Sequence, residues 1–157
     1  MNTLNYCDAY LKQLQAEHHR LNSAVLEIRH KLEGFRPSGE AGAKQNSLIN
    51  PLERLLTQLQ DHFTEEEKEE GVLQEAVVRC RSVRADVKAL MCQHTQIAEA
   101  LQRLIVDTKS GAIDGETCRQ MFDSFATQLK AHECGENTLL QFALGGEASD
   151  CDVEGNE

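Results

Sequence analysis

The chain has 157 residues, with 16 lysines and arginines against 26 aspartates and glutamates, which gives a net charge of −10. An acidic surface repels phosphate backbones, so this charge argues against nucleic acid as a partner. No apolar run approaches the roughly 18 residues of a membrane-spanning helix, and the first residues lack the basic-then-apolar layout of a signal peptide. We therefore expect a cytoplasmic protein that has no membrane partner.

Four segments of more than twenty residues are rich in leucine, alanine, glutamine and glutamate, and they are predicted to be helices. They span about 4–33, 48–69, 80–109 and 115–144. Their similar lengths predict an all-α fold, an antiparallel up-down-up-down four-helix bundle over residues 1–144. Residues 145–157 hold five acids and no base, and we expect a disordered acidic tail there.

Two helix starts carry capping signals. Asn50 followed by Pro51 predicts an N-cap with proline at the first helical position, and Ser47 is an alternative start one turn earlier. Asp114, ahead of Gly115 and an acidic first turn, predicts the cap of the last helix.

Apolar residues recur at spacings of three and four along every predicted helix, and one histidine interrupts each stripe near its middle. These histidines are His18, His62, His94 and His132. Glutamates follow two of them by four residues, on the same helical face. Burying such groups costs several kcal/mol unless each is paired or binds a metal ion. Imidazole and carboxylate are ligands that suit iron, manganese and zinc.

The expected topology places the two glutamates on the same side of the histidine layer, because the second and fourth helices run parallel. Four nitrogens and two bridging carboxylates are then suited to two metal ions, each with an open position for a small molecule. The predicted ligands are His18, His62, Glu66, His94, His132 and Glu136. His19 is the alternative to His18, and Glu65 is the alternative to Glu66. The rest of the acidic run 65–70 is predicted to be a solvated helix end, and His30 a surface residue.

These residues also carry a family resemblance. The pattern Glu17-His18-x-x-Leu21, His62-Phe63-x-x-Glu66, a single His94 and His132-x-x-x-Glu136 resembles the hemerythrin-like, or HHE cation-binding, family. The resemblance covers about residues 4–144. It implies a four-helix bundle that holds two iron ions joined by an oxo or hydroxo bridge. It also implies O2, NO or iron as the small ligand that is bound or sensed; manganese and zinc are the alternative metals.

Two positions depart from the oxygen-carrying members of that family. Leu90 stands one turn before His94, where the carriers place a fifth histidine, and Asn137 stands where their last helix offers an aspartate. The resulting four-histidine, two-glutamate set resembles the di-iron centre of bacterial iron–sulfur-cluster repair proteins. The sequence thus favours a non-enzymatic binding or sensing protein. The alternatives are a di-iron oxidoreductase, such as a ferroxidase, peroxidase or NO-related repair enzyme, and a metal-free or zinc-bound helical interaction module.

The six cysteines contain no C-x-x-C pair, and we expect them to be reduced. Cys7 and Cys118 begin antiparallel helices and are predicted to lie at opposite ends of the bundle. Cys92 and Cys134 each lie two residues from a stripe histidine, about 200° around the helix, and so should point away from the site. Cys151 falls in the predicted tail.

Overall fold

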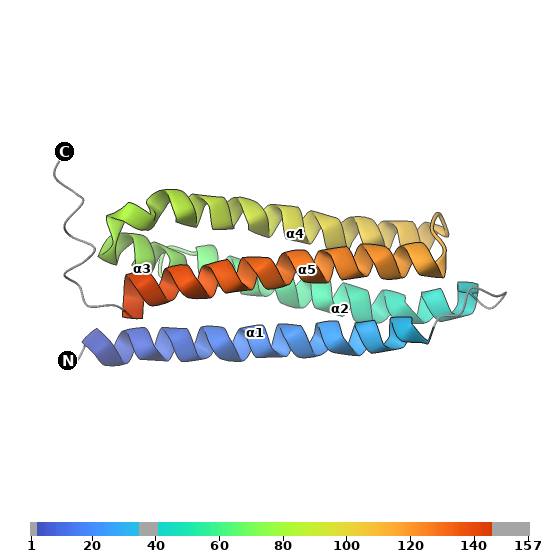
Figure 1. The fold of residues 1–157 in the computed structure, drawn as a ribbon, viewed down its shortest axis with the longest axis horizontal. Helices are drawn as coiled ribbons and strands as arrows, with labels where there is room; N and C mark the ends of the chain where they lie inside the picture. Colours follow the sequence, from blue (N-terminus) through green and yellow to red (C-terminus); the bar gives the residue numbers. More distant parts are fainter. Residues whose placement is uncertain (1–2, 35–40, 146–157) are drawn as a thin grey trace.

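The computed structural model describes residues 3–34 and 41–145. The predicted acidic tail from residue 146 onward, including Cys151, lies outside the described residues, as does the side chain of Cys7. The fold prediction is confirmed: four long helices run alternately up and down (Figure 1). They are α1 (Thr3–Glu33), α2 (Ala41–Glu67), α4 (Arg84–Ser110) and α5 (Gly115–Leu140).

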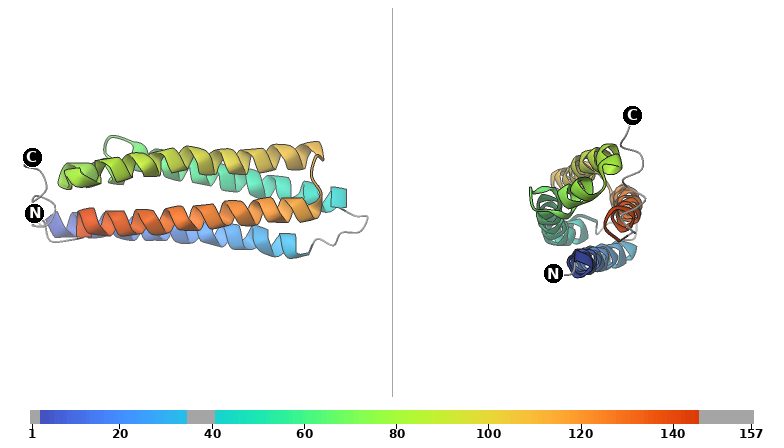
Figure 2. Two further views of the ribbon diagram at one scale, coloured as in Figure 1. Left: turned by 45° about the horizontal axis from the view of Figure 1, so that its top comes forward. Right: turned by 90° about the vertical axis from the view of Figure 1, so that its left-hand side faces the viewer.

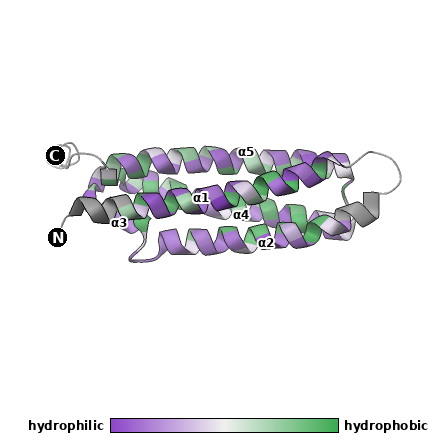
Figure 3. Ribbon diagram, turned by 90° about the horizontal axis from the view of Figure 1, so that it is seen from below, coloured by the Kyte–Doolittle hydropathy of each residue, from purple (hydrophilic) through white to green (hydrophobic). Residues whose placement is uncertain are grey.

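The long helices form a ring in which each packs on two others. Helix α1 contacts α2 and α5, and α4 contacts the same two from the other side. The view along the bundle in Figure 2 shows this arrangement. Each ribbon in Figure 3 alternates hydrophilic and hydrophobic stretches, as expected for helices that turn one apolar face inward. Within the described part of the chain, none of the helices is long and apolar enough to cross a membrane.

The start of the second helix was predicted wrongly. Helix α2 begins at Ala41, and Pro51 lies inside it. Proline has no N–H to donate, and in a helix interior it costs about 3 kcal/mol. Four leucines of the helix are at most 1% exposed, namely Leu48, Leu52, Leu55 and Leu59. Burying each stabilises the helix by roughly 1.5–3 kcal/mol, which outweighs the proline.

A short helix that was not predicted connects α2 to α4. Helix α3 (Val72–Arg79) lies between the second and third predicted helices, and a 3-10 turn (Arg81–Val83) takes the place of the predicted start of the third, so α4 begins at Arg84. Three residues of α3 are buried: Val72, Leu73 and Ala76. This helix closes the end of the bundle at which α1 begins and α5 ends (Figure 1).

The opposite turn, between α4 and α5, follows its capping chemistry. Gly111 ends α4 in the left-handed conformation, with φ at 71°, which glycine adopts without steric cost. The predicted cap at Asp114 is confirmed, because its carboxylate accepts the backbone N–H of Thr117 at 2.7 Å. A π-helical turn, Gln141–Gly145, continues α5 beyond Leu140.

The hydrophobic core is divided into two clusters. The larger includes Leu21, Leu59, Ile97 and Leu129 and extends toward the α4–α5 turn. The smaller includes Leu14, Leu73, Leu90 and Leu140 and lies toward α3. On α1, α4 and α5 the stripe histidine falls between residues of the two clusters, and on α2 His62 directly precedes Phe63, the last residue of the larger cluster on that helix. A buried polar layer therefore separates two apolar regions.

The four described cysteines form no disulfide: Cys80 and Cys118 are buried, and Cys92 and Cys134 are exposed. The exposed positions of Cys92 and Cys134 agree with the prediction that they point away from the bundle interior.

Candidate metal centre

The structure brings all six predicted ligands together in the polar layer. Each long helix supplies one histidine, and α2 and α5 each add a glutamate one turn further on. All six side chains are buried, with exposed fractions between 0% for Glu136 and 6% for His62. Water therefore has little access to groups that it would otherwise solvate, and their partners must come from inside the bundle.

The histidines form two pairs. The ring centres of His18 and His62 are 5.2 Å apart, and those of His94 and His132 are 4.8 Å apart. One ligand atom from each of His18, His62, Glu66 and Glu136 lies within 4.8 Å of the others. The same holds for His94, His132 and Glu136. Two adjacent positions therefore exist at which a metal ion could collect several donors.

Each glutamate joins the two pairs. Glu136 Oε1 lies 3.0 Å from His18 Nε2, and its Oε2 lies 3.3 Å from His132 Nε2. Glu66 Oε1 contacts His62 Nε2 directly, and its Oε2 lies 3.4 Å from His94 Nε2. Both carboxylates thus turn one oxygen toward each histidine pair. This is the arrangement in which a carboxylate bridges two metal ions.

Three histidines are oriented from outside the layer through their Nδ1 atoms. His62 donates to Glu17 at 2.7 Å, His94 to Glu67 at 3.0 Å, and His132 to Gln93 at 2.7 Å. An Nδ1–H held in this way leaves the Nε2 lone pair free to face the centre, as in many metal sites. His18 differs, because its buried Nδ1 has no hydrogen-bond partner among the described residues.

The two residues named above as alternative ligands lie on the surface. His19 is exposed, and the Glu65 side chain is 58% exposed and paired with Lys68. The sequence reasoning missed the three outer partners Glu17, Glu67 and Gln93. The prediction of a solvated helix end is wrong for Glu67, because its carboxylate reaches across to His94 on α4. None of the three lies on an apolar stripe, so periodicity gave no signal for them.

The histidines and glutamates of the layer shift one another's pKa values. Burial alone lowers the pKa of both His94 and His62, but contacts with Glu136 and Glu66 raise the pKa of His94 to about 10. Contacts with Glu66, Glu136 and Glu17 raise that of His62 to about 8. Burial opposes ionisation of Glu136, yet three imidazoles facing it hold its pKa well below its usual value. Burial raises the pKa of Glu66.

Several atoms of the layer that could ligate a metal ion make no hydrogen bond. They are both carboxylate oxygens of Glu66, Oε2 of Glu136, and Nε2 of His94 and of His132. Buried polar atoms without partners are rare in proteins and require an explanation. All five face the centre of the layer, and metal coordination would satisfy them. The donor set therefore fits a metal ion.

Phe63 fills the space between the histidines. Its ring stacks on that of His94 with centres 3.9 Å apart and planes 11° apart, and it meets His132 edge-on. Glu133 is a further buried carboxylate beside the layer, where it accepts a hydrogen bond from Asn22 at 3.1 Å. These neighbours restrict the histidine rings and separate them from solvent.

The fold and the site together define a four-helix bundle with a candidate metal centre made of two histidine pairs and two glutamates. The family model described as the hemerythrin HHE cation binding domain matches residues 9–143. The chain belongs to this hemerythrin family, whose domain implies a metal cofactor, typically iron. Searches of curated proteins and of solved structures found no match.

Proposed function

We propose that this chain binds two iron ions at His18, His62, Glu66, His94, His132 and Glu136, and that it binds or senses O2, NO or iron there. The observation that carries the proposal is the position of the two glutamates, each with one oxygen toward each histidine pair. Four buried imidazoles and two carboxylates are also the mixed ligand set that suits iron, with manganese and zinc as alternatives.

Donor counting supports a role with a small ligand. Each ion would take two imidazole nitrogens and one oxygen from each glutamate, which leaves room for another ligand. When bound, the iron pair supplies electrons to, or accepts them from, a small diatomic molecule. Leu90, one turn before His94, is buried in the smaller hydrophobic cluster, and it adds no further donor. We also propose a cytoplasmic location, where cysteines remain reduced.

Metal analysis tests the proposal. Protein produced with ample iron and purified without chelator should contain two irons per chain and absorb in the near ultraviolet when oxidised. Glu66→Ala and Glu136→Ala should lose dinuclear occupancy, whereas the matched surface variant Glu65→Ala should keep it. His18→Ala and His19→Ala form a second matched pair with the same expectation. One zinc and no iron in the wild type would contradict the assignment.

The small ligand is tested with the reduced iron-loaded protein. Since the layer has no fifth imidazole, we expect air to oxidise the reduced protein without a long-lived O2 complex. We expect NO to change the absorption spectrum of the reduced protein. Leu90→His should shift the behaviour toward reversible O2 binding. A stable O2 complex of the wild type, reversed simply by removing O2, would identify an oxygen carrier instead.

A further inference from the structure

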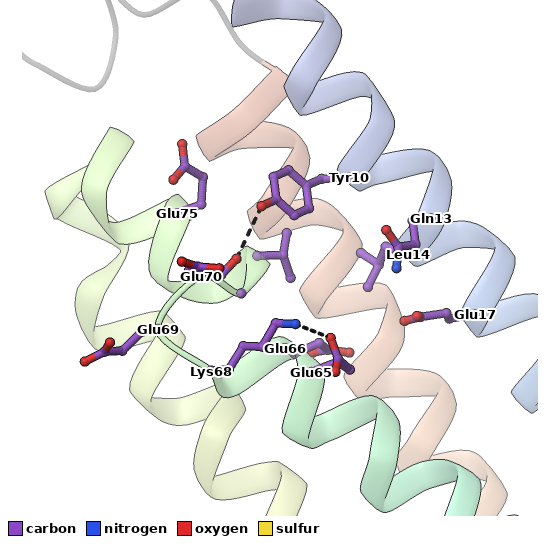
Figure 4. A pocket seen from close by; sticks show the side chains of 12 residues that line it. Tyr10, Gln13, Leu14, Glu17, Glu65, Glu66, Lys68, Glu69, Glu70 and Glu75 are labelled. Atoms are coloured by element: carbon purple, nitrogen blue, oxygen red, sulfur yellow. Dashed lines mark hydrogen bonds and ion pairs between the residues drawn. The ribbon is translucent and has the colours of Figure 1, made fainter.

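A cavity of about 540 Å³ opens beside the metal centre, between α1 and the turn that joins α2 to α3 (Figure 4). Twelve residues line it, and only one of them, Lys68, is a lysine or arginine. Half of the lining residues are glutamates: Glu17, Glu65, Glu66, Glu69, Glu70 and Glu75. We name this cavity, defined by these six glutamates and Lys68, the acidic vestibule.

The vestibule reaches the centre itself. Glu66, which forms part of its lining, is 2% exposed and is one of the two glutamates between the histidine pairs. Neither of its carboxylate oxygens makes a hydrogen bond. Glu17, on another wall, accepts the Nδ1–H of His62. The cavity therefore connects exposed residues such as Glu69 and Glu70 with a buried carboxylate that makes no hydrogen bond.

The vestibule is electrostatically suited to cations. Lys68 pairs with Glu65 in the cavity, and Arg79 pairs with Glu75 from outside it. Four other glutamates of the lining remain, and low-dielectric walls focus their field into the cavity. The hydroxyl of Tyr10 donates to the backbone carbonyl of Glu70 at 3.2 Å, which ties the turn to α1. The acidic side chains are thus carried by a turn that is anchored to the bundle.

Size favours the vestibule over a second opening. Six waters need roughly 60–90 Å³ of cavity volume, at about 10–15 Å³ each, so a divalent cation that keeps its six waters fits in the vestibule. The second cavity, of about 180 Å³ between α1 and α2, reaches His62. It has about a third of the volume of the vestibule, and Arg20 adds a positive charge to its lining.

We propose that the acidic vestibule is the uptake route by which hydrated divalent cations, Fe²⁺ among them, reach the metal centre. Glu69 and Glu70 attract the ion at the mouth, and Glu66 receives it at the floor. Lys68 opposes its passage. This inference rests on the proposed function, because it requires that the histidine and glutamate layer bind metal.

The experiment uses the full chain freed of metal, mixed with Co²⁺ at low ionic strength, and follows visible cobalt absorption in a stopped-flow instrument. Steering of this kind changes association rates by about 10- to 1000-fold, so Glu69→Gln/Glu70→Gln should slow uptake by about tenfold. Lys68→Gln should accelerate uptake, a gain that damage to the fold does not produce. All variants should still take up two ions at equilibrium.

Two controls define the route. Glu27→Gln/Glu99→Gln removes the same charge from exposed positions of α1 and α4 outside the vestibule, and it should leave the rate near that of the wild type. Asp61→Asn alters only the second opening of the two and should also have little effect. Salt of about 0.15 M, which screens charges beyond roughly 8 Å, should reduce the difference between wild type and the Glu69/Glu70 variant.

The outcomes separate the two proposals. A Glu69/Glu70 variant that loads as fast as the Glu27/Glu99 control overturns the vestibule route and leaves the metal centre intact. Slower loading in Asp61→Asn alone overturns it in favour of the second opening. A wild type that takes up no Co²⁺ and contains no iron overturns both the route and the proposed function.

Discussion

At the scale of single residues, the proposed metal centre depends on side chains that do not face it. Glu17, Glu67 and Gln93 each hold the Nδ1–H of one histidine, which fixes the ring and directs Nε2 inward. Gln93 offers the cleanest test, because it is uncharged and does not line the acidic vestibule. The other two partners also change the local charge when they are replaced.

Gln93→Ala should weaken metal binding by about 10- to 100-fold, the usual cost of removing such a partner. His132 then loses the acceptor that selects its tautomer. Competition with a metal chelator of known affinity measures the change, and Gln96→Ala, an exposed neighbour on α4, is the matched control. Equal affinities for the two variants would show that the hydrogen bond from His132 does not orient the ligand.

The two histidines with raised pKa values predict a pH dependence. At pH 7 the metal-free protein holds protons on His62, whose pKa is about 8, and on His94, whose pKa is about 10. Metal ions bind neutral imidazole, so binding must release these protons. Affinity should therefore rise with pH through about 8 and continue to rise toward 10.

The stability of the metal-free fold should change in the opposite direction. A pKa raised by folding stabilises the native state fully below the unfolded value of about 6.5, and this stabilisation is lost as pH rises through the folded value. The metal-binding prediction is measured by calorimetric titration in buffers of different ionisation heat, which counts the protons that metal binding releases.

A metal affinity that is flat between pH 7 and pH 9 would contradict the metal-binding prediction.

The inward residues could be predicted from the sequence, and the outer partners could not. His18, His62, His94 and His132 interrupt apolar stripes, so their burial follows from helical periodicity alone. Glu67 is adjacent in sequence to Glu66, and its role depends on the distance to α4, which only the packed bundle defines. The role of Gln93 depends in the same way on its distance to His132 on α5.

At the scale of elements, the turn between α2 and α3 positions Glu66. Gly71 is buried there against the end of α2, with its N–H bonded to the carbonyl of Lys68 at 2.8 Å. A Cβ at this position would lie 2.5 Å from the carbonyl oxygen of Glu66 and 2.7 Å from that of Glu65. The close approach of two backbone segments therefore requires glycine.

Gly71→Ala should destabilise the fold by about 1–3 kcal/mol, the usual range for overpacking, and should weaken metal binding because Glu66 must shift. Gly135→Ala is the matched control: no atom lies within 4 Å of its Cβ position inside α5. This substitution should stabilise the helix by about 0.5–1 kcal/mol. Denaturant unfolding measures both changes. Similar stabilities for the two variants would show that the α2–α3 turn tolerates a side chain.

The four long helices could be predicted from their apolar periodicity, but two features of the elements could not. Pro51 indicates a helix start by local rules, and only the packing of leucines on both sides of it keeps it inside α2. Helix α3 is only eight residues long, shorter than isolated helices that are stable in water. It depends on burial of Leu73 and its neighbours against the bundle end.

At the scale of the whole molecule, the bundle consists of two apolar clusters separated by a charged layer. Without metal, several donor atoms in this layer have no hydrogen bond, and each such atom costs free energy. A metal ion that binds only the native state supplies the missing contacts and adds stability by mass action. The melting temperature of the chain should therefore depend on metal.

Free metal at 100 times its dissociation constant stabilises by about 2.7 kcal/mol. For a chain of this size, 1 kcal/mol shifts the melting temperature by roughly 2–4 °C, so chelation should lower it by roughly 5–10 °C. Circular dichroism with and without chelator measures the shift, with metal content determined on the same samples. In Glu66→Gln/Glu136→Gln, which lacks both carboxylates between the histidine pairs, the shift should be small or absent. An unchanged melting curve after complete removal of metal from the wild type would mean that the buried histidines and glutamates satisfy one another without any ion.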